Sequence, residues 1–96
     1  MHPAKVDRNK LNKLTDLPNV GPATAKDLVL LGIHHHDALK GQDPLTLYLR
    51  LCDLTGERHD PCVLDVFMSL VAFSEGDDPR PWWDYTEARK ARYPEI

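Results

Sequence analysis

The sequence has no long run of apolar residues, although 42% of its 96 residues are hydrophobic. No stretch approaches the roughly 18 consecutive apolar residues of a membrane span, so a membrane-spanning protein is excluded and no membrane partner is expected. Residues 1–5 lack the apolar segment of a secretory signal peptide, which favours a cytoplasmic location. The two cysteines are expected to stay reduced in that compartment.

An excess of basic charge is also absent. The 12 basic and 15 acidic residues give a net charge of −3, which is an unfavourable total for a nucleic-acid-binding protein. Residues 1–32 carry five basic and three acidic side chains, a net +2, whereas residues 33–96 carry seven and twelve, a net −5. Any surface that faces a polyanion is therefore expected near the N-terminus, and its attraction should be weak.

Proline, aspartate and glycine punctuate the apolar pattern in the way that helix ends require. Asp43 and Asp60 are suited to cap helices that begin at Pro44 and Pro61, and Gly56 is suited to end the first of these. No alternating strand pattern of useful length is present. We therefore predict a single all-α domain, a compact bundle of about five or six short helices. The predicted helices cover about residues 9–16, 22–31, 36–40, 44–55, 61–73 and 84–93.

Two of these predicted helices meet in a very tight turn at residues 17–22. Gly21 has no Cβ, so its backbone can adopt a conformation that is closed to other residues and can approach a ligand closely. The free amides at the start of the next helix point outward with the positive end of the helix dipole, which makes an anion site. A phosphate oxygen is the natural occupant of such a site. The predicted phosphate-binding residues are Val20, Gly21, Ala23, Thr24, Lys26 and Lys13.

The turn resembles the helix-hairpin-helix modules that bind DNA, whose usual sequence is Leu-Pro-Gly-Ile-Gly-Pro followed by a basic residue, a variable residue and Ala. The resemblance covers about residues 11–33 and implies contacts from main-chain amides to the DNA backbone. Asn19 stands where the usual motif has its first glycine, and Ala23 stands where it often has a basic residue. Asparagine tolerates left-handed geometry, so the turn can still form. The missing cation removes one favourable phosphate contact.

A longer resemblance, over about residues 11–90, is to small bacterial helix-hairpin-helix proteins of the pathogenicity-locus family, which are sometimes labelled mitomycin resistance. The segments that carry it are residues 17–22, 40–44, 60–67 and 82–83. The hairpin is also similar to the C-terminal domain of competence regulators of the TfoX type. Neither resemblance implies a catalytic activity or a cofactor.

Hairpins in this architecture are commonly paired about a pseudo-two-fold axis, with a short helix between them. Residues 55–61 would then be a degenerate second hairpin, with Gly56 as its turn residue and Arg58 and His59 able to contact a second phosphate. The same segment carries two acidic side chains and lacks a Gly-x-Gly spacing, which favours a plain helix-capping loop.

The predicted organisation is an N-terminal arm, a helix-hairpin-helix domain and a C-terminal extension, over residues 1–10, 11–76 and 77–96. Within the domain, the first hairpin unit, the connector and the degenerate second unit cover residues 11–33, 34–42 and 43–76.

In the extension, Trp82 and Trp83 are expected to hold the segment against the bundle, or alternatively to offer a stacking platform for an unpaired base. The last helix is expected to open at Asp84, with Glu87 in the capping-box position. A small basic patch that suits the end of this helix consists of Arg89, Lys90 and Arg92.

Two other sets of reactive side chains could in principle form a functional site. Cys52, His59 and Cys62 are zinc-type ligands, but their spacing is not that of a known finger, and only the distant residues 34–36 could complete a set of four. No metal site is predicted, and the three histidines 34–36 are interpreted as a solvated lead-in to the next helix. Cys62 lies in a first helical turn, where the dipole would lower the pKa of its thiol. No oxyanion device or resolving cysteine is evident, so no catalytic residue is predicted.

The sequence therefore predicts non-catalytic, sequence-nonspecific binding to the DNA backbone, in a context of DNA repair or resistance to DNA damage. The alternative is a protein-interaction or regulatory module in which the hairpin is only structural and a protein partner meets the acidic face.

Overall fold

The fold is helical throughout. The computed structural model describes residues 1–96 and contains four α-helices, five 3-10 turns and no strand. The α-helices are α1 (Pro22–Leu30), α2 (Pro44–Thr55), α3 (Pro61–Ser74) and α4 (Thr86–Arg92). The 3-10 turns are Pro3–Lys5, Arg8–Lys10, Leu14–Asp16, His36–Leu39 and Trp82–Tyr85. The all-α prediction is confirmed, and none of the helices combines the length and apolar character needed to span a bilayer.

The first three α-helices begin and end within one residue of the predicted positions. Each has proline at its first position, where the missing N–H costs nothing. The carboxylates of Asp43 and Asp60 accept hydrogen bonds from the amides of Thr46 and Cys62, at 3.2 and 2.8 Å. Gly56 ends α2 with φ of 71°, a left-handed conformation that favours glycine.

The helix predicted over residues 9–16 is wrong. The chain there forms two separate 3-10 turns, because a side chain takes up backbone donors that an α-helix would use. The Asp16 carboxylate accepts hydrogen bonds from the amides of Asn12 and Lys13, both at 3.0 Å. A segment of this length also gains too few helical hydrogen bonds to offset the cost of nucleation.

Two further predicted helices differ from the structure. The segment predicted over 36–40 is the 3-10 turn His36–Leu39 rather than an α-helix. The last helix begins at Thr86 and has no side-chain cap, because Asp84 lies inside the preceding 3-10 turn. The molecule therefore has four α-helices, where five or six were predicted.

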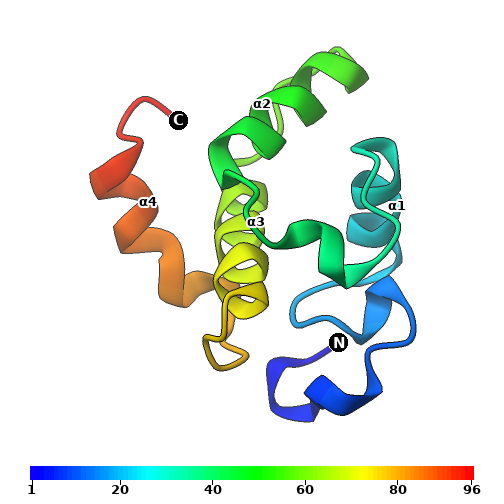
Figure 1. The fold of residues 1–96 in the computed structure, drawn as a ribbon. Coiled ribbons are helices and arrows are strands. Elements are labelled where there is room, and N and C mark those ends of the chain that lie inside the picture. The colour runs from blue at the N-terminus through cyan, green and yellow to red at the C-terminus, as the bar shows by residue number, and fades with distance from the viewer.

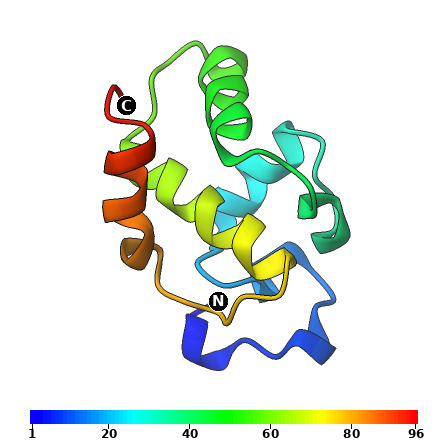
Figure 2. The ribbon, with the colours of Figure 1, turned by 60° about the vertical axis from the view of Figure 1, so that its left-hand side comes forward.

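Helix α3 runs through the middle of the molecule, with the other elements around it (Figure 1 and Figure 2). Eight of its 14 residues are buried, and it supplies six of the 15 side chains of the hydrophobic core. Those six are Leu64, Phe67, Met68, Leu70, Val71 and Phe73. A helix that is apolar on nearly every side must be covered on nearly every side, so α3 organises the packing of its neighbours.

A buried ion pair joins α4 to α3. Asp65 is fully buried, and its two carboxylate oxygens accept hydrogen bonds from Arg89 Nε and from Thr86 Oγ1, each at 2.8 Å. The hydrogen bond to Asp65 raises the pKa of Arg89. Arg89 is only 8% exposed, so it does not belong to the basic patch predicted with Lys90 and Arg92.

Replacing Asp65 with asparagine should destabilise the fold strongly, because the Arg89 guanidinium would stay buried without its counter-charge. Removing one partner of a buried ion pair costs about 3–5 kcal/mol. We expect the free energy of unfolding to fall by about that amount, as measured by urea denaturation followed by circular dichroism. Glu87→Gln, an exposed change on the same helix, should alter it by less than about 0.5 kcal/mol. A loss below about 1 kcal/mol for Asp65→Asn, the range of an exposed pair, would contradict this role.

Candidate nucleic-acid interface

The turn of residues 17–22 packs its apolar side chains into the core. Leu17 and Val20 are 1% and 0% exposed, so both side chains anchor the turn in the core. The Val20 amide donates to the Leu17 carbonyl at 3.4 Å, which leaves this residue no free donor for a phosphate. Asn19 has φ of 66°, which confirms that asparagine adopts the left-handed conformation at this position.

Asn19 also ties the turn to both ends of the chain. Its side-chain Nδ2 donates to Ser69 Oγ in α3 at 3.1 Å and to the Arg80 carbonyl at 2.8 Å. Its main-chain amide donates to the Met1 carbonyl at 2.9 Å. The N-terminal arm and the C-terminal extension therefore both lie against the turn, where the arm appears beside the end of α3 in Figure 2.

Gly21 does not need the conformational freedom that the sequence suggested. Its φ of −98° and ψ of −174° are extended backbone that any residue adopts, so that prediction is wrong. A Cβ built on Gly21 meets no atom within 4 Å. The side of the turn at Gly21 is thus open to solvent, and a side chain there would obstruct an approaching ligand without disturbing the fold.

The amides at the start of α1 have no partner within the chain. The first backbone bond of this turn of helix runs from the Ala25 amide to the Gly21 carbonyl at 2.9 Å, and no side chain caps the helix. Ala23 is exposed and Thr24 is half-buried. By contrast, α2 and α3 each have an aspartate carboxylate at their N-terminus. Among these three helices, only α1 has no carboxylate hydrogen-bonded to its first amides.

Lysine side chains supply the positive charge near this end of the molecule. Lys26 is exposed on α1, and Lys13 is exposed directly before the 3-10 turn that leads to the hairpin. Lys13 shares a surface depression with Lys5 and Lys10, and with Asp7 and Asp16 on the same rim. No residue of α1 lines this depression, so Lys5 and Lys10 lie outside the predicted phosphate-binding group.

The first amides of α3, after the loop that joins it to α2, are not free: those of Cys62 and Val63 donate to the carboxylate and the carbonyl of Asp60. The Asp60 carboxylate occupies the N-terminus of α3, where a second phosphate was predicted to bind. Arg58 Nη2 donates to the Glu95 carbonyl at 3.2 Å, and His59 Nε2 lies 2.8 Å from a threonine hydroxyl of α2. With Gly56 in the left-handed conformation at the end of α2, the geometry is that of a helix-capping loop.

The Cys62 thiol is not activated by its position at a helix N-terminus. Its hydrogen bond to the Asp60 carboxylate, together with desolvation, raises the pKa of Cys62, so the predicted lowering is wrong. The nearby carboxylate favours the protonated thiol, because it accepts a hydrogen bond from the thiol and repels the negative charge of the thiolate. The ligand atoms of Cys52, His59 and Cys62 do not all lie within 4.8 Å of one another, so these residues form no zinc-type cluster.

The two tryptophans have different environments. Trp82 and Trp83 meet edge to face, with ring centroids 5.5 Å apart. Trp82 is half-buried, whereas Trp83 is 59% exposed. Neither ring is among the side chains that pack against the core; in the extension Tyr85, Tyr93 and Ile96 do so. The expected attachment through the tryptophans is therefore made instead by these residues and by the Asp65–Arg89 ion pair.

Comparisons with known proteins identify the family of the chain. A family model described as Cdd1, pathogenicity locus, matches residues 7–91. The chain belongs to this family. A curated relative of this pathogenicity-locus protein is "Mitomycin resistance protein McrB" from Streptomyces lavendulae, which is 46% identical over 77 residues, covering 80% of this chain and 73% of the relative. No solved structure matches the chain.

Removing the negative charge beside Cys62 should make its thiol more reactive. In Asp60→Asn the amide still caps α3, but the carboxylate that raises the pKa of Cys62 is lost. We expect alkylation of Cys62 by iodoacetamide at pH 8 to become several-fold faster, as measured by mass spectrometry of the Cys62 peptide. The matched cap variant Asp43→Asn should leave the rate unchanged. An equal or slower rate in Asp60→Asn would show that the carboxylate does not control this thiol.

Proposed function

We propose that this pathogenicity-locus protein binds the DNA backbone without catalysis and without sequence preference. The contact is made by the main-chain amides of Ala23 and Thr24 at the N-terminus of α1. The observation that carries the proposal is that this helix N-terminus is exposed, has no cap, and lies beside the open face of Gly21. A phosphate oxygen supplies the negative charge that aspartates supply at α2 and α3.

The charge distribution supports weak binding of DNA at the N-terminus of α1 alone. Lys13 and Lys26 reinforce the amides, while the net charge of residues 33–96 is −5. The loop at residues 55–61 holds its own carboxylate, so the proposal does not include a second hairpin contact there. Phosphate contacts carry no information about base identity, so different duplex sequences should bind alike.

The biological setting follows from the resemblance to McrB, whose printed name refers to mitomycin resistance. We propose a role for this chain in DNA repair or in resistance to DNA damage. The exposed Trp83 ring is compatible with DNA that contains unpaired bases, so the binding experiment includes several DNA forms.

The Gly21→Val substitution tests the contact. The valine side chain has open space in the folded protein, but it would stand between the α1 amides and a phosphate. We expect the affinity for fluorescein-labelled duplex, single-stranded or branched DNA to fall at least about tenfold, the scale of one lost charge-assisted hydrogen bond. Fluorescence anisotropy measures the affinity, and thermal unfolding verifies that the variant is folded.

The control is Ala91→Val, which adds the same side chain at an exposed position of α4 and should bind like the unchanged protein. Equal binding by Gly21→Val would show that the hairpin is not the contact. If no DNA form binds even at low salt, the hairpin is only structural, and the protein-interaction hypothesis takes the place of this proposal.

The salt dependence gives an independent measurement. With about two phosphates neutralised by Lys13 and Lys26, the logarithm of the binding constant should fall against the logarithm of salt concentration with a slope of about −2. The double variant Lys13→Gln, Lys26→Gln should bind more weakly and bring the slope towards zero. A slope steeper than about −5 would indicate a larger basic surface than the one proposed.

A further inference from the structure

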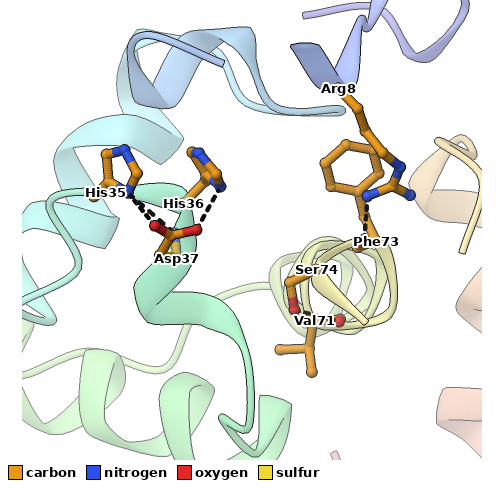
Figure 3. Close-up of polar contacts among 7 residues, drawn as sticks. All are labelled: Arg8, His35, His36, Asp37, Val71, Phe73 and Ser74. Carbon is orange, nitrogen blue, oxygen red and sulfur yellow. Dashed lines mark hydrogen bonds and ion pairs between the residues drawn. The ribbon is translucent and has the colours of Figure 1, made fainter. Parts of the chain in front are cut away.

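The connector between α1 and α2 brings three metal-ligating side chains together. His35 and His36 both present their Nδ1 atoms to the carboxylate of Asp37, as Figure 3 shows. The distance from His35 Nδ1 to Asp37 Oδ2 is 3.4 Å, and that from His36 Nδ1 to Asp37 Oδ1 is 3.3 Å. The ligand atoms of all three residues lie within 4.8 Å of one another.

These distances suit a transition-metal ion. Zinc bonds to imidazole nitrogen and carboxylate oxygen are about 2.0–2.2 Å long, so neighbouring ligand atoms in a tetrahedral site lie about 3.3 Å apart. Imidazole with carboxylate is a donor set that Zn²⁺, Ni²⁺ and Cu²⁺ accept, whereas Mg²⁺ and Ca²⁺ prefer oxygen alone.

The backbone geometry holds the cluster together. The Asp37 amide donates to His35 Nδ1 at 3.3 Å, so the lone pair of this nitrogen is directed at that amide and becomes available to an ion when the ion replaces the hydrogen bond. The imidazole rings of His35 and His36 lie 4.2 Å apart between centroids. The 3-10 turn His36–Leu39 fixes two of the three residues, and the buried Leu39 anchors that turn in the core.

The surroundings leave the cluster accessible. Asp37 and His35 have side chains that are 80% and 58% exposed, and His36 is 31% exposed. Lys40 and Arg8 line the same surface depression as His36 and Asp37. The Arg8 guanidinium is held at the C-terminal end of α3, because its Nη1 donates to the Phe73 carbonyl at 2.7 Å and the guanidinium lies 3.9 Å from the centroid of the Phe73 ring.

We propose that His35, His36 and Asp37 form a binding site for one divalent transition-metal ion of the zinc type. The ion takes the two Nδ1 nitrogens and a carboxylate oxygen as ligands and keeps its remaining positions for water or an incoming group. It replaces the 3.3 Å hydrogen bond at His35 Nδ1 and cross-links the connector. The site is separate from the α1 amides and does not depend on DNA binding.

Isothermal titration of the full chain with zinc chloride at pH 7.5 tests the site. We expect one ion per chain, and thermal unfolding at saturating zinc should shift to a higher temperature, because the ion binds only the folded cluster. Asp37→Asn and His36→Ala should each weaken the affinity at least about tenfold and abolish the thermal shift. Asparagine keeps the shape of Asp37, whose side chain makes no other hydrogen bond in the fold, so this variant stays folded.

Two controls separate the cluster from other zinc ligands. His34→Ala removes the first histidine of the run, and Cys62→Ser removes a free thiol; both should bind zinc like the unchanged protein. Absence of binding overturns the proposal. So does an equal loss in His34→Ala, which would indicate an unstructured histidine run, or loss of binding in Cys62→Ser, which would place the ion at the thiols.

Discussion

One stripe along α3 holds the molecule together. Residues 65, 69 and 73 lie four apart and therefore share a face of the helix. Asp65 accepts a hydrogen bond from Arg89 of α4, and Ser69 accepts one from Asn19 in the turn of residues 17–22. The carbonyl and ring of Phe73 both contact Arg8 of the N-terminal arm. Three segments that are remote in sequence thus attach at successive turns of one helix. The exposed N-terminus of α1 has its orientation because the turn before it is fixed in this way.

Local sequence signals specified the helices that have clear ends. Proline at the first position fixed the start of α1, α2 and α3, and aspartate caps reinforced two of those starts. The leucine spacing predicted a helix over residues 9–16, but it carries no sign of the hydrogen bonds that the Asn12 and Lys13 amides donate to the Asp16 carboxylate. The start of α4 was misplaced because Asp84 has the right residue type but lies within a 3-10 turn.

Long-range partners could not be predicted from the sequence. Asp65 and Ser69 lie in a mainly apolar helix. No nearby sequence signal predicts that Arg89 and Asn19 are their hydrogen-bond partners. The backbone geometry of the candidate site at Asn19 and Gly21 was also only partly predictable from the sequence. The motif predicted unusual backbone geometry at both positions, but only Asn19 has a positive φ, whereas Gly21 is extended. The contribution of Gly21 is instead that it leaves the surface beside the α1 amides unobstructed.

The position of the stripe makes α3 dependent on the segment that follows it. Both oxygens of the buried Asp65 carboxylate are satisfied by side chains of α4, Arg89 and Thr86. Without α4, this carboxylate would be a polar group without a partner on the central helix, and burying it would cost free energy. Removing α4 therefore takes away more than the surface that it covers, because α3 itself can no longer be buried without that cost.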